Sequence, residues 1–169
     1  MISIGEKAPD FTLTGDDSNQ WRLSDQIGNV AVLLFYPGNE TLVCTRQLCS
    51  IRDNWASYFE TKALIVGISP AEPAEHKLFS ERRSLPFKLL ADPGRKVTSV
   101  YAKHALLPVS LTRGILIVDA KGIVRMRDIM LRAFRPKDDE LITEIYAARG
   151  DELHDKYDKL RGRLQPHRR

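Results

Sequence analysis

Three apolar runs along the chain predict β-strands that are buried on both faces. They lie at residues 30–35, 63–68 and 114–118, and they are rich in the β-branched and aromatic side chains that favour strands. The runs are continuous and do not alternate with polar residues, as a strand with one face in water would. Because such strands need cover on both faces, the pattern predicts an α/β sheet flanked by helices.

Helical periodicity separates and follows these strands. Apolar side chains in residues 44–59 recur at i, i+3, i+4 and i+7, which predicts one long helix. Residues 71–83 are typical of a surface helix with Pro73 in the first turn, where proline is tolerated. Residues 138–149 predict a last packed helix that stops at Gly150.

Turn signals predict two hairpins. Residues 119–122 read Asp-Ala-Lys-Gly between two apolar segments, which favours a β-hairpin there. A smaller hairpin is predicted near the N-terminus, with strands around residues 11–13 and 20–23. The whole order is then hairpin, strand, helix, strand, helix, hairpin, helix.

Length and charge favour one domain with a basic extension. The chain has 169 residues, about the length of one domain, and a net charge of +4 with a pI near 9.1. Residues 158–169 alone carry a net +4, so the preceding residues are neutral overall. We therefore expect a domain at 1–150 and a charged, basic C-terminal extension at 151–169, solvated rather than a nucleic-acid-binding arm.

No membrane segment or signal peptide is predicted. The longest apolar run has seven residues, 30–36, whereas a membrane-spanning helix needs about 20. This pattern predicts a cytoplasmic protein without a membrane partner. Two cysteines are too few for the disulfide framework of a secreted domain, so they are expected to be buried, metal-bound or redox-active.

Both cysteines, Cys44 and Cys49, lie early in the first predicted helix, directly after a buried strand. A thiol in the first helical turn faces unpaired N–H groups and the positive end of the helix dipole, which favour the thiolate. An ordinary cysteine is only about 3% thiolate at pH 7, because its pKa is about 8.5. Glu40 would oppose ionisation if it pointed inward, so we expect a nearby cation.

The spacing of the two cysteines argues against a permanent disulfide between them. Five residues of regular helix rise about 7.5 Å, beyond the Cα separation of about 4.4–6.8 Å that a disulfide tolerates. Their side chains also point about 140° apart. A Cys44–Cys49 disulfide therefore requires local unwinding of the helix, which favours a transient bond.

The residues around Cys44 resemble a known family. Pro37, Thr41 and Cys44 form Pro-x-x-x-Thr-x-x-Cys, which resembles the peroxidatic loop of peroxiredoxins. Arg113 is similar to the catalytic arginine of that family. Further matching segments resemble the Q-type (bacterioferritin comigratory protein) subfamily of the alkyl hydroperoxide reductase/thiol-specific antioxidant family: residues 9–13, 35–37, 49–53, 67–69 and 90–92.

The resemblance implies a fold and a reaction. The fold would be thioredoxin-like, a central mixed β-sheet flanked by helices with a small N-terminal β-hairpin. The activity would be that of a thiol peroxidase in which Cys44 is the peroxidatic and Cys49 the resolving cysteine, recycled by thioredoxin or a similar dithiol. Thr41 would bond thiolate and peroxide, Pro37 would shield the site, and Arg113 would supply a fixed positive charge. Neither a cofactor nor a metal is implied, and the oligomer is expected to be a monomer, with a dimer left open.

Two positions depart from the family pattern. Leu42 and Val43 stand where Pro-Gly or Pro-Val is usual, which removes one backbone constraint. Gln47 stands where glutamate is common, which keeps a hydrogen-bonding group without its charge.

Other functions are less well supported by the residues. A disulfide oxidoreductase would need Cys-x-x-Cys, and the spacing of the cysteines does not suit zinc. The histidines are scattered singly, at His76, His104, His154 and His167. The alternative hypothesis is a non-catalytic redox sensor or binding module with the same thioredoxin fold.

Overall fold

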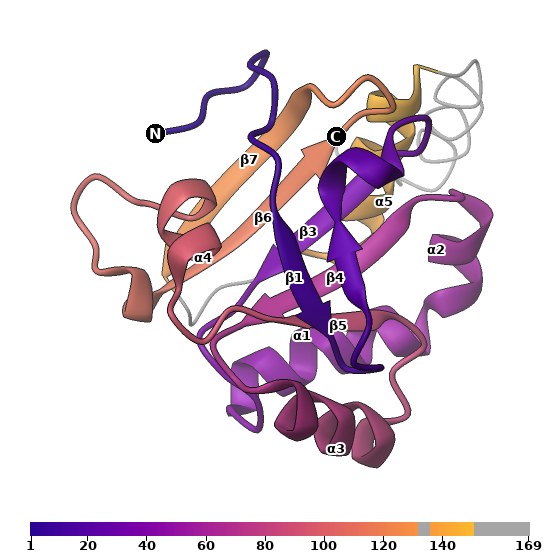
Figure 1. Ribbon diagram of the computed structural model, residues 1–169. Helices are drawn as coiled ribbons and strands as arrows, with labels where there is room; N and C mark the ends of the chain where they lie inside the picture. Colours follow the sequence, from indigo (N-terminus) through magenta and orange to yellow (C-terminus); the bar gives the residue numbers. More distant parts are fainter. Residues whose placement is uncertain (132–135, 151–169) are drawn as a thin grey trace, which may run out of the picture.

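A computed structural model of the protein describes residues 1–131 and 136–150, without the side chains of residues 42–44 and 131. Its centre is one seven-stranded sheet in the order β2-β1-β5-β4-β3-β6-β7 (Figure 1). The three middle strands β3, β4 and β5 are parallel, and the outer strands pair antiparallel. The strands are β1 (Thr12–Gly15), β2 (Gln20–Arg22), β3 (Ala31–Phe35), β4 (Leu64–Ser69), β5 (Lys88–Ala91), β6 (Thr112–Val118) and β7 (Val124–Leu131).

Helices cover both faces of this sheet. They are η1 (Leu23–Gln26), α1 (Leu42–Asp53), α2 (Trp55–Glu60), α3 (Pro73–Arg83), α4 (Lys96–Tyr101), η2 (Val109–Leu111) and α5 (Asp138–Arg149). Successive side chains of β3 point to opposite faces. Val32 and Leu34 pack with α1, α2, α3 and α5, whereas Leu33 and Phe35 pack with α4 and the N-terminal segment. Each strand residue therefore has apolar cover, which confirms the expectation of a strand buried on both faces.

The pattern of the sequence predicted most of these elements. The three buried strands, both hairpins and the last helix with its stop at Gly150 are confirmed, and Gly150 has the left-handed φ of 68° that suits glycine. Pro73 begins α3, as expected for a proline in the first turn.

The prediction of one helix over residues 44–59 is wrong. α1 ends at Asp53 and α2 begins at Trp55, with Asn54 between them at φ −104° and ψ 21°. The Asn54 side chain donates to the Ser50 carbonyl at 2.9 Å, and it also donates to Asp138 at 3.2 Å. Such side-chain hydrogen bonds compete with the backbone ladder, so the apolar stripe continues across a break.

β5 and α4 were not predicted from the apolar pattern. They have four and six residues, too few for periodicity to show. Asp92 joins them, because its carboxylate accepts from the backbone N–H of Thr98 at 2.8 Å and from its hydroxyl at 2.6 Å. The described part of the chain contains no helix long and apolar enough to cross a membrane. The predicted extension 151–169 lies outside the described residues.

Candidate active site

The predicted site residues gather at the carboxyl end of β3. Pro37 follows this strand, Thr41 occupies the N-cap position of α1, and Cys44 lies in the first turn of that helix. Arg113 enters from β6, where the next residue, Gly114, pairs with Phe35 of β3. Residues far apart in the sequence are thus brought to one edge of the sheet. The Cys44 side chain lies outside the described residues.

A buried guanidinium contacts the second turn of α1. Arg113 is fully buried, and its Nη1 donates to Oε1 of Gln47, which is only 3% exposed. Gln47 comes three residues after Cys44, one helical turn along the same side. A buried cation thus binds the helical turn that follows Cys44, and Gln47 supplies a hydrogen bond without a charge.

Thr41 leaves the start of α1 open. Its side chain makes no capping hydrogen bond, and its hydroxyl instead donates to the Gly38 carbonyl at 3.4 Å. The first N–H groups of a helix carry partial positive charge, and without a side-chain cap they can bind an anion. Thr41 must turn its hydroxyl from Gly38 to donate to a thiolate or a peroxide.

Asn39, in the loop between Pro37 and Thr41, is held by contacts with two buried side chains. It accepts from the Tyr36 hydroxyl at 2.8 Å, and its amide lies 3.1 Å from Nδ1 of His76 in α3. His76 is fully buried, with Nε2 3.4 Å from Oγ of Ser69. Burial lowers the pKa of His76, so this anchor contains a neutral imidazole.

Glu40 anchors the same loop from outside. Its carboxylate binds Arg83 at 2.8 Å and Arg82 at 3.7 Å, both in α3, and all three side chains are partly exposed. Glu40 therefore points toward α3, where its negative charge is paired with two arginines. Sequence reasoning did not assign a role to His76, Arg82 or Arg83, because no local motif marks them.

Cys49 is a free, half-buried thiol in the same helix as Cys44. It lies close to Arg83: the pKa of this arginine is raised chiefly by its hydrogen bond and charge interaction with Glu40, and Cys49 adds a smaller electrostatic contribution. The arginine that binds Glu40 thus also interacts electrostatically with the predicted resolving thiol.

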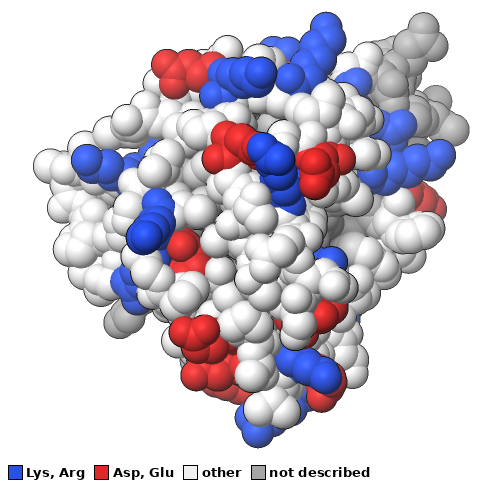
Figure 2. Space-filling model, in the orientation of Figure 1, with Lys and Arg blue, Asp and Glu red and all other residues white. Residues whose placement is uncertain are grey.

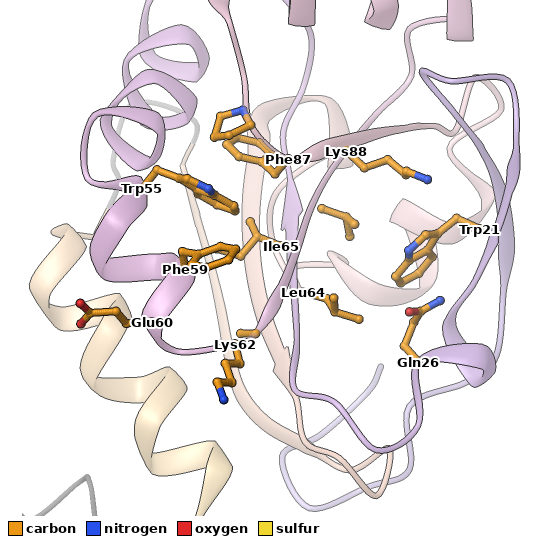
Figure 3. A pocket seen from close by; sticks show the side chains of 13 residues that line it. Trp21, Gln26, Trp55, Phe59, Glu60, Lys62, Leu64, Ile65, Phe87 and Lys88 are labelled. Carbon is orange, nitrogen blue, oxygen red and sulfur yellow. The ribbon is translucent and has the colours of Figure 1, made fainter.

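A large cavity of about 1030 Å³ lies at the amino ends of the parallel strands β4 and β5, whereas the predicted site lies at the carboxyl end of β3 (Figure 3). Trp55 and Phe59 of α2 line it on one side of β4, and Trp21 and Gln26 line it on the other. It contains none of the predicted site residues. Among the described residues no three His, Cys, Asp or Glu side chains gather as metal ligands would.

Comparison with known proteins places the chain in a family. The model of the AhpC/TSA family matches residues 4–127, and the chain belongs to this family. It is 36% identical over 137 residues to peroxiredoxin Q, chloroplastic, of Populus jackii, covering 80% of this chain and 63% of that protein. It is 42% identical over 100 residues to peroxiredoxin Bcp of Bacillus subtilis, covering 59% of this chain and 64% of that protein. The matches thus span less than two thirds of both relatives.

Solved structures share the fold. The crystal structure of the peroxidoxin BcpB from Mycobacterium tuberculosis has a TM-score of 0.74 at 27% identity, covering 88% of this chain and 99% of that chain. A reduced 2-Cys peroxiredoxin of Plasmodium vivax has a TM-score of 0.77 at 23% identity, covering 92% and 84%, which shows the fold alone. The predicted thioredoxin-like fold and the resemblance to Q-type proteins are confirmed.

Proposed function

We propose that this protein is a thiol peroxidase that reduces hydrogen peroxide and organic hydroperoxides. The observation that carries the proposal is the buried Arg113–Gln47 contact at the second turn of α1, one turn after Cys44, in a member of the AhpC/TSA family. A fixed cation and an uncapped helix N-terminus together favour both a thiolate and the negative charge that develops on a breaking O–O bond.

In the first step the Cys44 thiolate attacks the distal oxygen of the peroxide. An S–O bond forms, the O–O bond breaks, and its electron pair leaves with the proximal oxygen, which takes a proton and departs as water or an alcohol. Cys44 becomes a sulfenic acid. Arg113 and the Thr41 hydroxyl stabilise the departing oxygen, and Pro37 limits access of water.

In the second step the Cys49 thiol attacks the Cys44 sulfenic acid. An S–S bond forms, and the sulfenic oxygen leaves with two protons as water. Thioredoxin or a similar dithiol then reduces the disulfide by two electrons and becomes a disulfide itself. Because α1 runs unbroken from Leu42 to Asp53, its first part must uncoil before the two sulfurs can meet.

Stopped-flow oxidation of the reduced protein by hydrogen peroxide, followed by tryptophan fluorescence, tests the proposal, with thiol counts by mass spectrometry. We expect fast oxidation, loss of two thiols within one chain and recycling by a thioredoxin system. Cys44→Ser should abolish turnover, and Cys49→Ser should stop at the sulfenic acid. Oxidation no faster than that of a free thiol, or oxidation without turnover, would overturn the proposal and favour the redox sensor.

A further inference from the structure

The loop before Thr41 is fastened to one helix, α3, at two points. Asn39 reaches the buried His76 near the start of α3, and Glu40 reaches Arg83 at its end. Glu40 also has a left-handed backbone, with φ 60°, although it is not glycine. Such a conformation persists only where surrounding contacts hold it. The left-handed backbone of Glu40 and its ion pair with Arg83 therefore occur together, in one conformation of the loop.

The second half of α1 is fastened more firmly than the first. Asp138, at the start of α5, accepts a hydrogen bond from Ser50, from Asn54 at 3.2 Å and from Tyr58 at 2.6 Å. All three donors follow Cys49, so uncoiling of α1 as far as Cys49 leaves these bonds intact. Uncoiling instead disturbs the junction between the loop and the first turns of α1, together with Gln47, which binds Arg113, and the buried Leu48.

Arg83 stays with the fixed part of the molecule during such a movement. Its backbone carbonyl accepts from Nη1 of Arg52 at 2.5 Å, and Arg52 lies in the second half of α1. Because Arg52 follows Cys49 by three residues, one helical turn, this hydrogen bond places Arg83 at the turn of α1 that carries Cys49, with which it also interacts electrostatically. When the loop moves, Glu40 leaves and the Arg83 guanidinium remains beside the thiol.

We propose that the Glu40–Arg83 ion pair is a latch that sets the rate of disulfide formation. This inference rests on the proposed function. Closed, the latch holds the loop in the form in which Cys44 meets peroxide. Opened, it frees the first turns of α1 to uncoil and leaves the Arg83 charge without Glu40, so that it stabilises the Cys49 thiolate that attacks the sulfenic acid. Glu40 and Arg83 act as positioning residues.

Stopped-flow oxidation separates the two steps. The first phase depends on peroxide concentration and reports the sulfenic acid, and the second is independent of it and reports the disulfide. Glu40→Gln should speed the second phase about two- to fivefold, the range expected for an exposed ion pair. With excess peroxide it should also form less sulfinic acid, because the disulfide captures the sulfenic acid sooner.

The matched control is Asp17→Asn, which breaks the Asp17–Lys88 ion pair. That pair has the same 2.8 Å separation and similar exposure, and it lies away from α1. About 1 M NaCl should bring the second phase of the wild type and of Asp17→Asn to the rate of Glu40→Gln, which salt should leave unchanged. Arg83→Met loses both the latch and the cation, so its second phase should be slower than that of Glu40→Gln.

Different results overturn different statements. If the wild type forms the disulfide but Glu40→Gln matches Asp17→Asn in both phases, the latch is wrong and the peroxidase stands. If Arg83→Met is as fast as Glu40→Gln, the role of the Arg83 charge at Cys49 is wrong. If the wild type loses only one thiol, the disulfide step of the proposed function is wrong and the latch with it.

Discussion

Gln47 is a neutral side chain at a buried position beside a guanidinium, three residues after Cys44, the proposed peroxidatic cysteine. A carboxylate there would also accept from Arg113, but it would bring a negative charge to within about 5–6 Å of the thiol. At the effective dielectric of protein sites, two charges at that distance interact by about 3 kcal/mol. The amide therefore positions Arg113 without opposing the thiolate.

Gln47→Glu should shift the pH dependence of the peroxide reaction. We expect the apparent pKa of the first oxidation phase to rise by about two units, because the added charge disfavours the thiolate by about 3 kcal/mol. Below that pKa the rate should fall about a hundredfold, whereas the rate at high pH should change little. Gln47→Met, which removes the acceptor without adding a charge, is the control. A pH profile shared by Gln47→Glu and the wild type would contradict this role for the amide.

At the scale of elements, Asp138 joins three helices. It begins α5 and binds Ser50 of α1, Asn54 between the helices and Tyr58 of α2. Tyr58 is fully buried, so its hydroxyl has no access to water as a substitute acceptor. The carboxylate thus fixes the part of α1 that follows Cys49.

Asp138→Asn should destabilise the fold by about 1–3 kcal/mol, because buried donors lose a charged acceptor. The free energy of unfolding in urea measures this loss. Asp139→Asn is the matched control, since it changes the same charge in the same first turn of α5 and has an equal effect on the helix dipole. Equal losses for the two variants would mean that the dipole, and not the contacts with α1 and α2, accounts for the effect.

The helices and strands also show which parts of the fold and of the site could be predicted from the sequence. Long apolar runs identified β3, β4 and β6, because burial on both faces leaves a composition that is visible locally. The resemblance supplied Pro37, Thr41, Cys44, Cys49 and Arg113, whose catalytic roles stay predictions. The anchors of the loop could not be found this way. Asn39 and His76 are 37 residues apart, and Glu40 and Arg83 are 43 apart, so only the packing of α3 against α1 brings them together.

At the scale of the whole molecule, two features concern charge. One is the distribution of charged side chains on the surface, and the other is the Asp10 carboxylate, which holds the N-terminal segment in place. Acidic and basic side chains lie interspersed on the face shown in Figure 2. Asp10 binds Arg22 at 2.8 Å and accepts from the backbone and the hydroxyl of Ser24, each at 2.9 Å. Burial raises the pKa of Asp10, but these hydrogen bonds outweigh it and lower the pKa to about 2.

Asp10→Asn should lower stability at neutral pH by about 1 kcal/mol, a value reduced from the full shift because the side chain is partly exposed. A carboxylate whose pKa is lowered by folding stabilises above its unfolded pKa of about 3.9 and loses that effect as pH falls toward 2. Urea unfolding should therefore show a constant difference from the wild type above pH 5 that closes between pH 4 and 2. Asp25→Asn, an exposed carboxylate in η1, is the control. A difference that persists at pH 2 would contradict the assignment to Asp10.

Gly114 lies beside the site at a position where the neighbouring side chains leave little room for a Cβ atom. A methyl group at this position would stand 2.8 Å from Cδ1 of Ile129 and 3.1 Å from Cβ of Ala102. A methyl group would therefore require the end of the Ile129 side chain to shift, and a larger side chain would also crowd Ala102 and Phe35, next to Arg113. Substitutions are therefore restricted next to the arginine, at a residue that has no side chain and takes no part in the proposed chemistry.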